Sequence, residues 1–287
     1  MSLFRQFTYK KFGVLPFDAP VAEQVNQQEF DPYIKILFLK KGSHIGIDFN
    51  KYKLKDDALF FINVNQWYEL PLPDASSGSL IYYNRDFYCV EIHDKEVSCD
   101  GILYNNVYEI PVVYLSKAES GQVQQILAEI VQEIKNDEPA MEEMLRILLK
   151  KLIIIATRIW KKEHSIITSE ASQDIEFLRK FSQLVELHYK KLHTVADYAN
   201  MLAMSPKMLH KHITKTGQAS PNDLIKERII LEAKRLLAHT PLSVKEIGYA
   251  LGYEDPAYFV RLFTKQAGTS PVEFRKQYNH VEGKKVQ

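Results

Sequence analysis

Two stretches of the C-terminal third decide its fold, because one repeats the other. Ser205-Pro-Lys-Met-Leu-His-Lys-His-Ile-Thr-Lys215 recurs 50 residues later as Asp255-Pro-Ala-Tyr-Phe-Val-Arg-Leu-Phe-Thr-Lys265. The stretch that precedes each copy also repeats, since Val195-Ala-Asp-Tyr-Ala-Asn-Met-Leu-Ala203 aligns with Val244-Lys-Glu-Ile-Gly-Tyr-Ala-Leu-Gly252 at a shift of 49. A repeat at a fixed period indicates that one structural unit occurs twice.

Each copy has the signals of a short helix, a tight turn and a second helix. Thr194 and Ser243 stand where helix N-caps belong, and an acidic residue follows each of them after three positions. Small residues stand in the middle of the first helix of each copy, where a crossing helix must approach closely. The second helices begin at Pro206 and Pro256, behind a capping Ser or Asp. This pattern predicts helix-turn-helix units at 194–217 and 243–268.

Residues 221–238 form one continuous amphipathic pattern between the two units. A helix of roughly 17 residues spans about 25 Å. Such a spacer places two recognition helices in successive major grooves on one face of DNA, roughly 34 Å apart.

Over residues 180–278 the chain resembles the AraC/XylS family of transcriptional regulators. The second copy carries the signature in Ile247-Gly-Tyr-Ala-Leu-Gly-Tyr253, Tyr258-Phe259, Arg261, Phe263, Lys265, Gly268, Ser270-Pro271 and Phe274-Arg275. The first copy departs from it, with Lys211 in place of the usual Arg and a shortened segment before Gly217. The resemblance implies a sequence-specific regulator that binds double-stranded DNA, with RNA polymerase as a further partner.

Apolar spacing assigns the faces of the two recognition helices. Leu209 and Ile213 form the buried pair of the first, and Phe259 and Phe263 that of the second. The family match then puts base contacts at Lys207, His210, Lys211, Ala257, Tyr258 and Arg261. Phosphate contacts are expected at Ser205, Thr214, Lys215, Thr264 and Lys265. The alternative is that these basic residues are the solvated face of surface helices.

Charge divides the chain into two parts, and composition excludes several classes of protein. Residues 1–172 hold 19 Lys and Arg against 24 Asp and Glu, whereas residues 173–287 hold 18 against 12. A basic module is therefore joined to a mildly acidic one. No apolar run approaches the roughly 20 residues of a membrane span, and the N-terminus has no apolar signal region. Two cysteines make no disulfide framework, so a cytoplasmic location is expected.

The pattern of apolar runs in the first 116 residues predicts β-strands. Short apolar runs at 33–39, 45–49, 58–64, 80–83 and 112–115 are β-branched or aromatic, and several are separated by turn formers. Their number and the scarcity of helix between them favour an antiparallel sandwich or small barrel. The resemblance makes this a cupin-like effector and dimerisation domain, so the expected fold is multidomain. It has a mainly-β barrel at 1–116, two helices within 117–162, and an all-α C-terminal domain.

The domain boundaries follow from the change of pattern. Residues 1–163 form the first domain, 164–172 a polar linker, and 173–287 the DNA-binding domain. In the second helix a 3.5-residue seam predicts side-by-side packing with a partner, as in a homodimer. Its residues are Met141, Leu145, Leu148, Leu152, Ile155 and Ile159. The alternative is a helix fully buried within the chain.

Aromatic residues of the first domain supply a candidate effector pocket, although core packing explains them equally well. They are Trp67, Tyr68, Tyr82, Tyr83, Phe87 and Tyr88. Three further donors, Cys89, His93 and Cys99, are a weak zinc alternative, and we expect no metal and no cofactor.

Three functions remain open. The first is a DNA-binding regulator controlled by a small effector or partner. The second is a dimeric DNA-binding protein whose barrel serves only association. The third is a cupin-like enzyme with a DNA-binding appendage, which lacks a visible metal centre or nucleophile, so we expect no enzyme.

Overall fold

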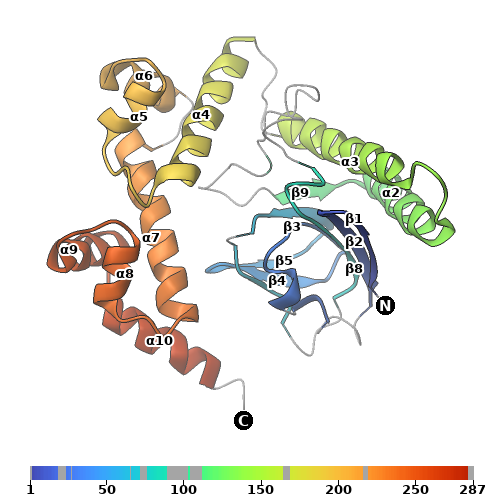
Figure 1. Ribbon diagram of the computed structural model, residues 1–287, viewed down its shortest axis with the longest axis horizontal. Coiled ribbons are helices and arrows are strands. Elements are labelled where there is room, and N and C mark those ends of the chain that lie inside the picture. Colours follow the sequence, from blue (N-terminus) through green and yellow to red (C-terminus); the bar gives the residue numbers. More distant parts are fainter. Residues whose placement is uncertain are drawn as a thin grey trace. The chain divides into compact units, whose positions relative to one another are not determined.

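The computed structural model describes residues 2–18, 24–26, 28–64, 66–71, 76–88, 103, 112–163, 169–215 and 219–283. The chain divides into two compact units, Met1–Ile167 and Thr168–Gln287. The first is built from strands followed by two helices, and the second is entirely helical in its described part (Figure 1). This confirms the predicted fold class.

The strands of the N-terminal unit form two antiparallel sheets. The larger has the order β1-β2-β8-β3-β6-β9, and the smaller has the order β5-β4-β7. The strands are β1 (Leu3–Phe7), β2 (Lys10–Phe17), β3 (Ile34–Leu39), β4 (His44–Ile47), β5 (Asn50–Lys53), β6 (Asp57–Ile62), β7 (Tyr68–Glu69), β8 (Gly78–Tyr83) and β9 (Val112–Leu115). In the described residues the barrel is thus an open one made of two sheets.

The core of this unit lies between the two sheets. Strand alternation points Leu37 and Leu39 of β3 inward, where they join Ile45 and Ile47 of β4 in one buried cluster. The side chains on the other face of the larger sheet are buried as well, because that face packs against helices. Both faces of the central strands are therefore buried, and β3 is buried at every position.

Four strands, β1, β2, β5 and β7, lie outside the runs predicted from the sequence. Gly13 and Pro16 interrupt the pattern of β2, and Pro16 has no N–H to give to a ladder. Gly13 is required there because a Cβ at its position would lie 2.2 Å from the Tyr82 ring of the neighbouring β8. Gly13 therefore leaves room for the Tyr82 ring to lie against the backbone of β2.

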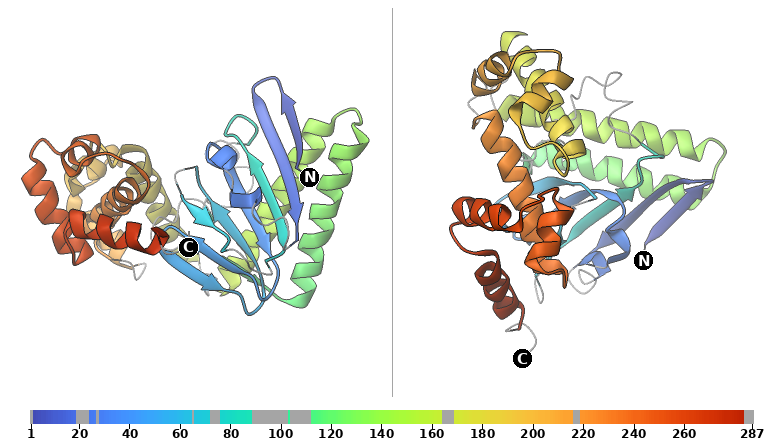
Figure 2. Two further views of the ribbon diagram at one scale, coloured as in Figure 1. Left: turned by 90° about the horizontal axis from the view of Figure 1, so that it is seen from below. Right: turned by 60° about the vertical axis from the view of Figure 1, so that its left-hand side comes forward.

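Helices α2 (Lys117–Asn136) and α3 (Met141–Glu163) lie along one face of the larger sheet (Figure 2). Ser116 caps α2 in a capping box with Glu119, whose carboxylate accepts a hydrogen bond from the Ser116 N–H at 2.8 Å. That hydrogen-bonded Ser116 lowers the pKa of Glu119. The connection between the helices turns at Asp137, which takes a left-handed conformation (φ 54°).

The seam predicted to face a partner is covered within the chain itself. Leu145 and Leu152 are fully buried, Met141, Leu148 and Ile159 are at most 8% exposed, and Ile155 is half-buried. The physical reason is that α3 packs against α2 and β9 and uses this stripe to do so. The residues of α3 that are left exposed are others, above all Met144 and Ile147.

The C-terminal unit consists of seven helices in its described part. They are α4 (Ser169–His188), α5 (Val195–Met201), α6 (Pro206–Lys215), α7 (Pro221–His239), α8 (Val244–Ala250), α9 (Pro256–Ala267) and α10 (Pro271–Gly283). Because α4 begins at Ser169, residues 169–172 of the predicted linker are helical. Among the described residues, none of the helices in either unit combines the length and the apolar composition that a membrane crossing needs.

Candidate DNA-binding surface

Two helix-turn-helix motifs, α5–α6 and α8–α9, occupy the predicted repeat. Both first helices begin with a capping box, in which Thr194 and Asp197, or Ser243 and Glu246, exchange hydrogen bonds between side chain and backbone. The hydrogen-bonded Ser243 lowers the pKa of Glu246. The same local device thus starts each motif.

The turns of the two motifs have the same backbone shape. Ala203 (φ 53°) and Gly252 (φ 82°), which are equivalent in the repeat, are both left-handed. Glycine adopts this conformation without strain, whereas Ala203 does so at a cost of roughly 1 kcal/mol. The turn shape is therefore set by the packing of the two helices and not by glycine alone.

The buried pairs of the two recognition helices are confirmed. Leu209 and Ile213 of α6 are fully buried, as are Phe259 and Phe263 of α9. The opposite faces are open to solvent, and they carry all six residues predicted to contact bases: Lys207, His210, Lys211, Ala257, Tyr258 and Arg261. Lys211 and Arg261 hold the same repeat position, so each recognition helix presents one basic side chain at that point.

The residues predicted to contact phosphate fall into two kinds. Lys215 and Lys265 are exposed at the ends of their helices. The hydroxyls of Thr214 and Thr264 instead donate to carbonyls one turn back, at 2.9 and 2.8 Å. The Ser205 hydroxyl accepts from the Met208 N–H at 3.3 Å as a helix cap. The two lysines are therefore the exposed cations of this set, and the three hydroxyls already form hydrogen bonds within the chain.

Arg261 has an acidic neighbour. Its guanidinium lies 3.6 Å from the carboxylate of Asp255, which also accepts the N–H of Ala257 at 2.8 Å as the cap of α9. Both side chains of the ion pair are largely exposed, so the pair adds little to stability. It nevertheless favours one orientation of the arginine along the surface of α9.

A buried arginine fixes the spacer helix α7. Arg228 is 1% exposed and forms two hydrogen bonds with Glu186 of α4, at 2.5 and 3.0 Å. Its guanidinium also lies 3.9 Å from the centre of the Tyr189 ring and contacts Glu232. Burial alone would lower the pKa of Arg228, but the hydrogen bonds and charge of Glu186 outweigh it and raise that pKa. Sequence reasoning missed this network, because its partners lie 42 residues apart.

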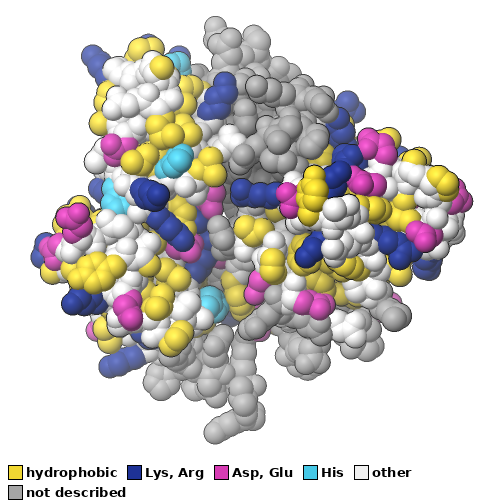
Figure 3. Space-filling view, viewed as in Figure 1, with side chains coloured by type: hydrophobic (Ala, Val, Ile, Leu, Met, Phe, Trp, Pro, Cys, Tyr) yellow, Lys and Arg dark blue, Asp and Glu magenta, His cyan; other side chains and the backbone are white. Residues whose placement is uncertain are grey.

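Charges of both signs occur on the face of the molecule shown in Figure 3, where Lys and Arg side chains are interspersed with acidic and apolar ones. That face therefore carries no broad positive plane.

The aromatic residues predicted for an effector pocket do not converge. Tyr68 and Tyr82 belong to the core between the sheets. Tyr83 follows Tyr82 in β8 and so points to the opposite face, where Tyr88 contacts its ring. Phe87 lies under the guanidinium of Arg146 of α3, and Trp67 is half-buried. The structure divides this set between two faces of the sheet.

A buried lysine was not predicted and lies in the core between the sheets. Lys35 of β3 shares the inward face with Leu37, and it pairs in register with Tyr82 and Ile62. Its ammonium donates to the carbonyl of Phe30 at 3.0 Å and lies over the Tyr68 ring. Burial lowers the pKa of Lys35 to about 8. The alternation of β3, with a lysine among apolar inward residues, was the available signal.

The weak zinc alternative of Cys89, His93 and Cys99 lies outside the described residues. Within the described part of the chain, no group of three His, Cys, Asp or Glu side chains is arranged to hold a metal ion.

Comparison with known proteins adds the family. A family model described as a helix-turn-helix domain matches residues 198–277, which span most of the two motifs. The C-terminal unit therefore holds the helix-turn-helix domain of AraC-family regulators, and the chain is a DNA-binding transcription regulator.

One of the relatives of this regulator extends the likeness beyond the matched domain. It is 24% identical to the transcriptional activator RhaR of Enterobacter sp. (strain 638), over 82% of this chain and 80% of that protein. It is 32% identical to the transcriptional regulator YijO of Escherichia coli (strain K12), over 38% of each. The C-terminal domain of the response regulator AraT from Geobacillus stearothermophilus is 29% identical, covering 35% of this chain and 84% of that one with a TM-score of 0.34.

Proposed function

We propose that the regulator reads DNA with α6 and α9 in two successive major grooves. The observation that carries this proposal is the equivalence of Lys211 and Arg261, which are both exposed opposite a buried pair on twin helices. Bidentate donation from such residues to guanine O6 and N7 is the commonest specific contact in the major groove. The 19 residues of α7 span roughly 28 Å, which suits helices that enter grooves about one turn apart.

Selection of the full chain on a random duplex library, at near-physiological salt, tests the proposal. Two enriched half-sites about 10 base pairs apart support it. A single enriched half-site means that one motif alone reads bases. Binding without enrichment that disappears as salt rises means nonspecific attraction to phosphate, and it overturns the proposal.

An effector at the N-terminal unit is the second part of the proposed function. It is supported by Lys35, a cation between the sheets whose ammonium donates to the backbone carbonyls of Phe30 and Asp31. A buried cation favours an anionic group, so a small carboxylate is the effector class that we propose. Thermal shift with a panel of carboxylates, compared between the native chain and Lys35→Met, tests this. Equal shifts in both proteins contradict a role for Lys35.

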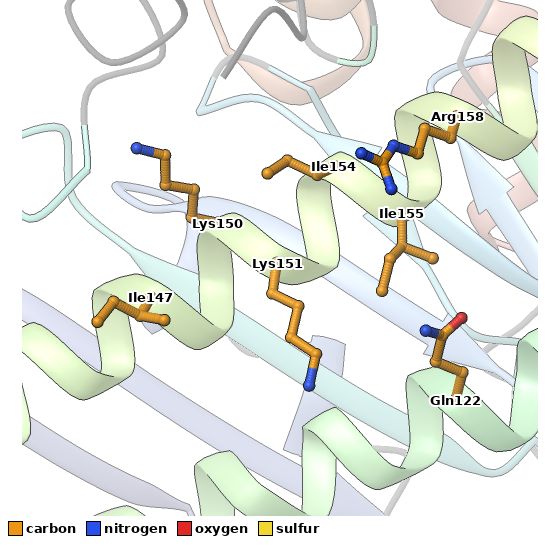
Figure 4. A pocket seen from close by; sticks show the side chains of 7 residues that line it. All are labelled: Gln122, Ile147, Lys150, Lys151, Ile154, Ile155 and Arg158. Atoms are coloured by element: carbon orange, nitrogen blue, oxygen red, sulfur yellow. The ribbon is translucent and has the colours of Figure 1, made fainter. Parts of the chain in front are cut away.

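Self-association is the third part, and we assign it to the exposed stripe of α3. Met144 and Ile147 are 45% and 51% exposed. A groove of about 500 Å³ continues the stripe, lined by residues of α3 and by Gln122 of α2 (Figure 4): Ile147, Lys150, Lys151, Ile154, Ile155 and Arg158. The helix has acidic residues in its first turn and lysines in its last turn, so two antiparallel copies bring opposite charges together.

The oligomeric state tests this assignment. Ile147→Glu is expected to shift the mass measured by sedimentation from dimer to monomer, whereas Gln125→Glu, on α2 outside the groove, leaves it unchanged. If the Ile147→Glu variant is still a dimer, the assignment is wrong. We further propose that the chain acts as a regulator and not as an enzyme, which is supported by the names of its relatives.

A further inference from the structure

A direct contact joins the two helix-turn-helix motifs independently of α7. The ring nitrogen Nε2 of His193, which lies just before the cap of α5, donates to the carbonyl of Leu251 at 2.9 Å. The same ring stacks on Tyr253, with 4.5 Å between ring centres and 24° between planes. Leu251 and Tyr253 belong to the turn of the second motif, so a residue at the start of the first motif lies against it.

Gly252 brings the two backbones together at this contact. A Cβ at its position would lie 2.1 Å from the carbonyl oxygen of Lys190, which belongs to the segment between α4 and α5. Gly252 also has a φ of 82°, which only glycine adopts readily. The close approach and the His193 contact therefore occur at one place, which we call the His193–Tyr253 bridge.

One end of the bridge continues into the recognition helix α9, and the other continues into α5, the first helix of the other motif. Tyr253 is largely buried, and its ring lies 5.8 Å from that of Tyr258 and 5.7 Å from that of Phe259, both on α9. On the other side, the Tyr198 hydroxyl of α5 donates to the carbonyl of Leu192, next to His193. A rotation of one motif against the other has to break these contacts.

We propose that the His193–Tyr253 bridge is a positioning device that fixes the distance between the two half-sites on DNA. One helix alone leaves the joint between the motifs free to twist, since α8–α9 touch the rest of the unit mainly through α7 and α10. The bridge is a second point of attachment, and two points of attachment define the relative orientation of the motifs. His193 itself contacts no base under this proposal, which rests on tandem groove reading as the function.

The test measures affinity against half-site spacing. The full chain is titrated onto duplexes that carry both half-sites at the selected spacing, at that spacing plus one or two base pairs, or one half-site alone. For His193→Ala we expect affinity for the selected spacing to fall about tenfold, from loss of one hydrogen bond and one ring contact. We expect affinity for single half-sites to stay unchanged and the penalty for added base pairs to shrink.

Matched variants separate the bridge from general stability. His193→Gln keeps an N–H donor for Leu251 without the ring, and intermediate spacing discrimination is expected. Asn222→Ala, at an exposed position of α7, serves as the control with the native spacing profile. Equal losses on single and paired half-sites, or a native profile for His193→Ala, overturn the bridge. A native chain indifferent to spacing instead contradicts the proposed function itself.

Discussion

Arg261 and the residue that caps its helix form an ion pair, with 3.6 Å between Nη2 of Arg261 and Oδ2 of Asp255. Asp255 therefore does two things at once, since it also accepts the Ala257 N–H. The cap acts on the stability of α9, whereas the ion pair acts on the orientation of one side chain. Substitutions that separate these roles give the first prediction.

Asp255→Asn is expected to leave the free energy of unfolding nearly unchanged, because Asn caps a helix as well as Asp does and the lost ion pair is exposed. Asp255→Ala removes the cap and is expected to cost about 1 kcal/mol. Urea denaturation followed by circular dichroism measures both. Equal destabilisation by the two variants would show that charge, and not capping, is what matters.

Alanine at Lys211 or Arg261 is expected to relax base preference and to weaken binding to the selected site by about 1–3 kcal/mol. The controls are Lys215→Ala and Lys265→Ala, which should weaken binding to all sequences alike and flatten its salt dependence. Competition binding against mutated duplexes distinguishes the two pairs. Unchanged specificity in both Lys211→Ala and Arg261→Ala would rule out the groove assignment.

Arg228→Met is expected to destabilise the C-terminal unit by about 3–5 kcal/mol, because it leaves the carboxylates of Glu186 and Glu232 beside an apolar side chain. Lys226→Met, on the same helix at a half-buried position, is the matched control and should cost far less. Thermal unfolding of the full chain gives the comparison. A small loss for Arg228→Met would mean that the network is not needed.

Gly248→Ala is expected to be neutral or to stabilise by up to about 1 kcal/mol, because alanine favours the helix interior. The Cβ would lie 3.4 Å from the ring of Phe259, which is tight but close to ordinary contact, and the first motif already holds Ala199 at this place. Gly248→Leu should destabilise strongly by overpacking. Strong loss in the alanine variant would show that the crossing tolerates no side chain.

Stability at alkaline pH should report on Lys35. Its pKa in the folded state is about 8 because burial lowers it from 10.5, so between these values the unfolded chain binds one more proton than the folded chain. The contribution of Lys35 to the free energy of unfolding therefore rises with pH, by about 3 kcal/mol across that interval. The difference in unfolding free energy between the native chain and Lys35→Met should move in favour of the native chain by that amount. A constant difference would contradict the lowered pKa.

Sequence reasoning succeeded where a repeat and a helical period coincide. The buried pairs of α6 and α9 follow from spacing alone, since a residue three or four places along a helix lies on the same face. On α3 the same reasoning identified an apolar seam but not the neighbour that covers it. Only the packing of α2 and β9 against α3 shows that this seam is covered within the chain and that Met144 and Ile147 are left exposed.

Contacts between distant residues were beyond prediction. Arg228 with Glu186 and His193 with Leu251 join residues 42 and 58 positions apart. Nothing in the local pattern of either partner specifies the other. The Lys35 site could be predicted only in part. Strand alternation places the lysine inward, but the carbonyls that accept its hydrogen bonds belong to the segment around Phe30.

The number of residues in the unbroken α7 helix also sets the rotation of one motif relative to the other. Each residue of an α-helix advances the chain by about 1.5 Å but turns it by about 100°. One residue inserted into α7 would therefore leave the separation of the two motifs almost unaltered and swing α9 to another side of the DNA axis. Evolution can lengthen this spacer without loss of phase only in steps that complete whole turns.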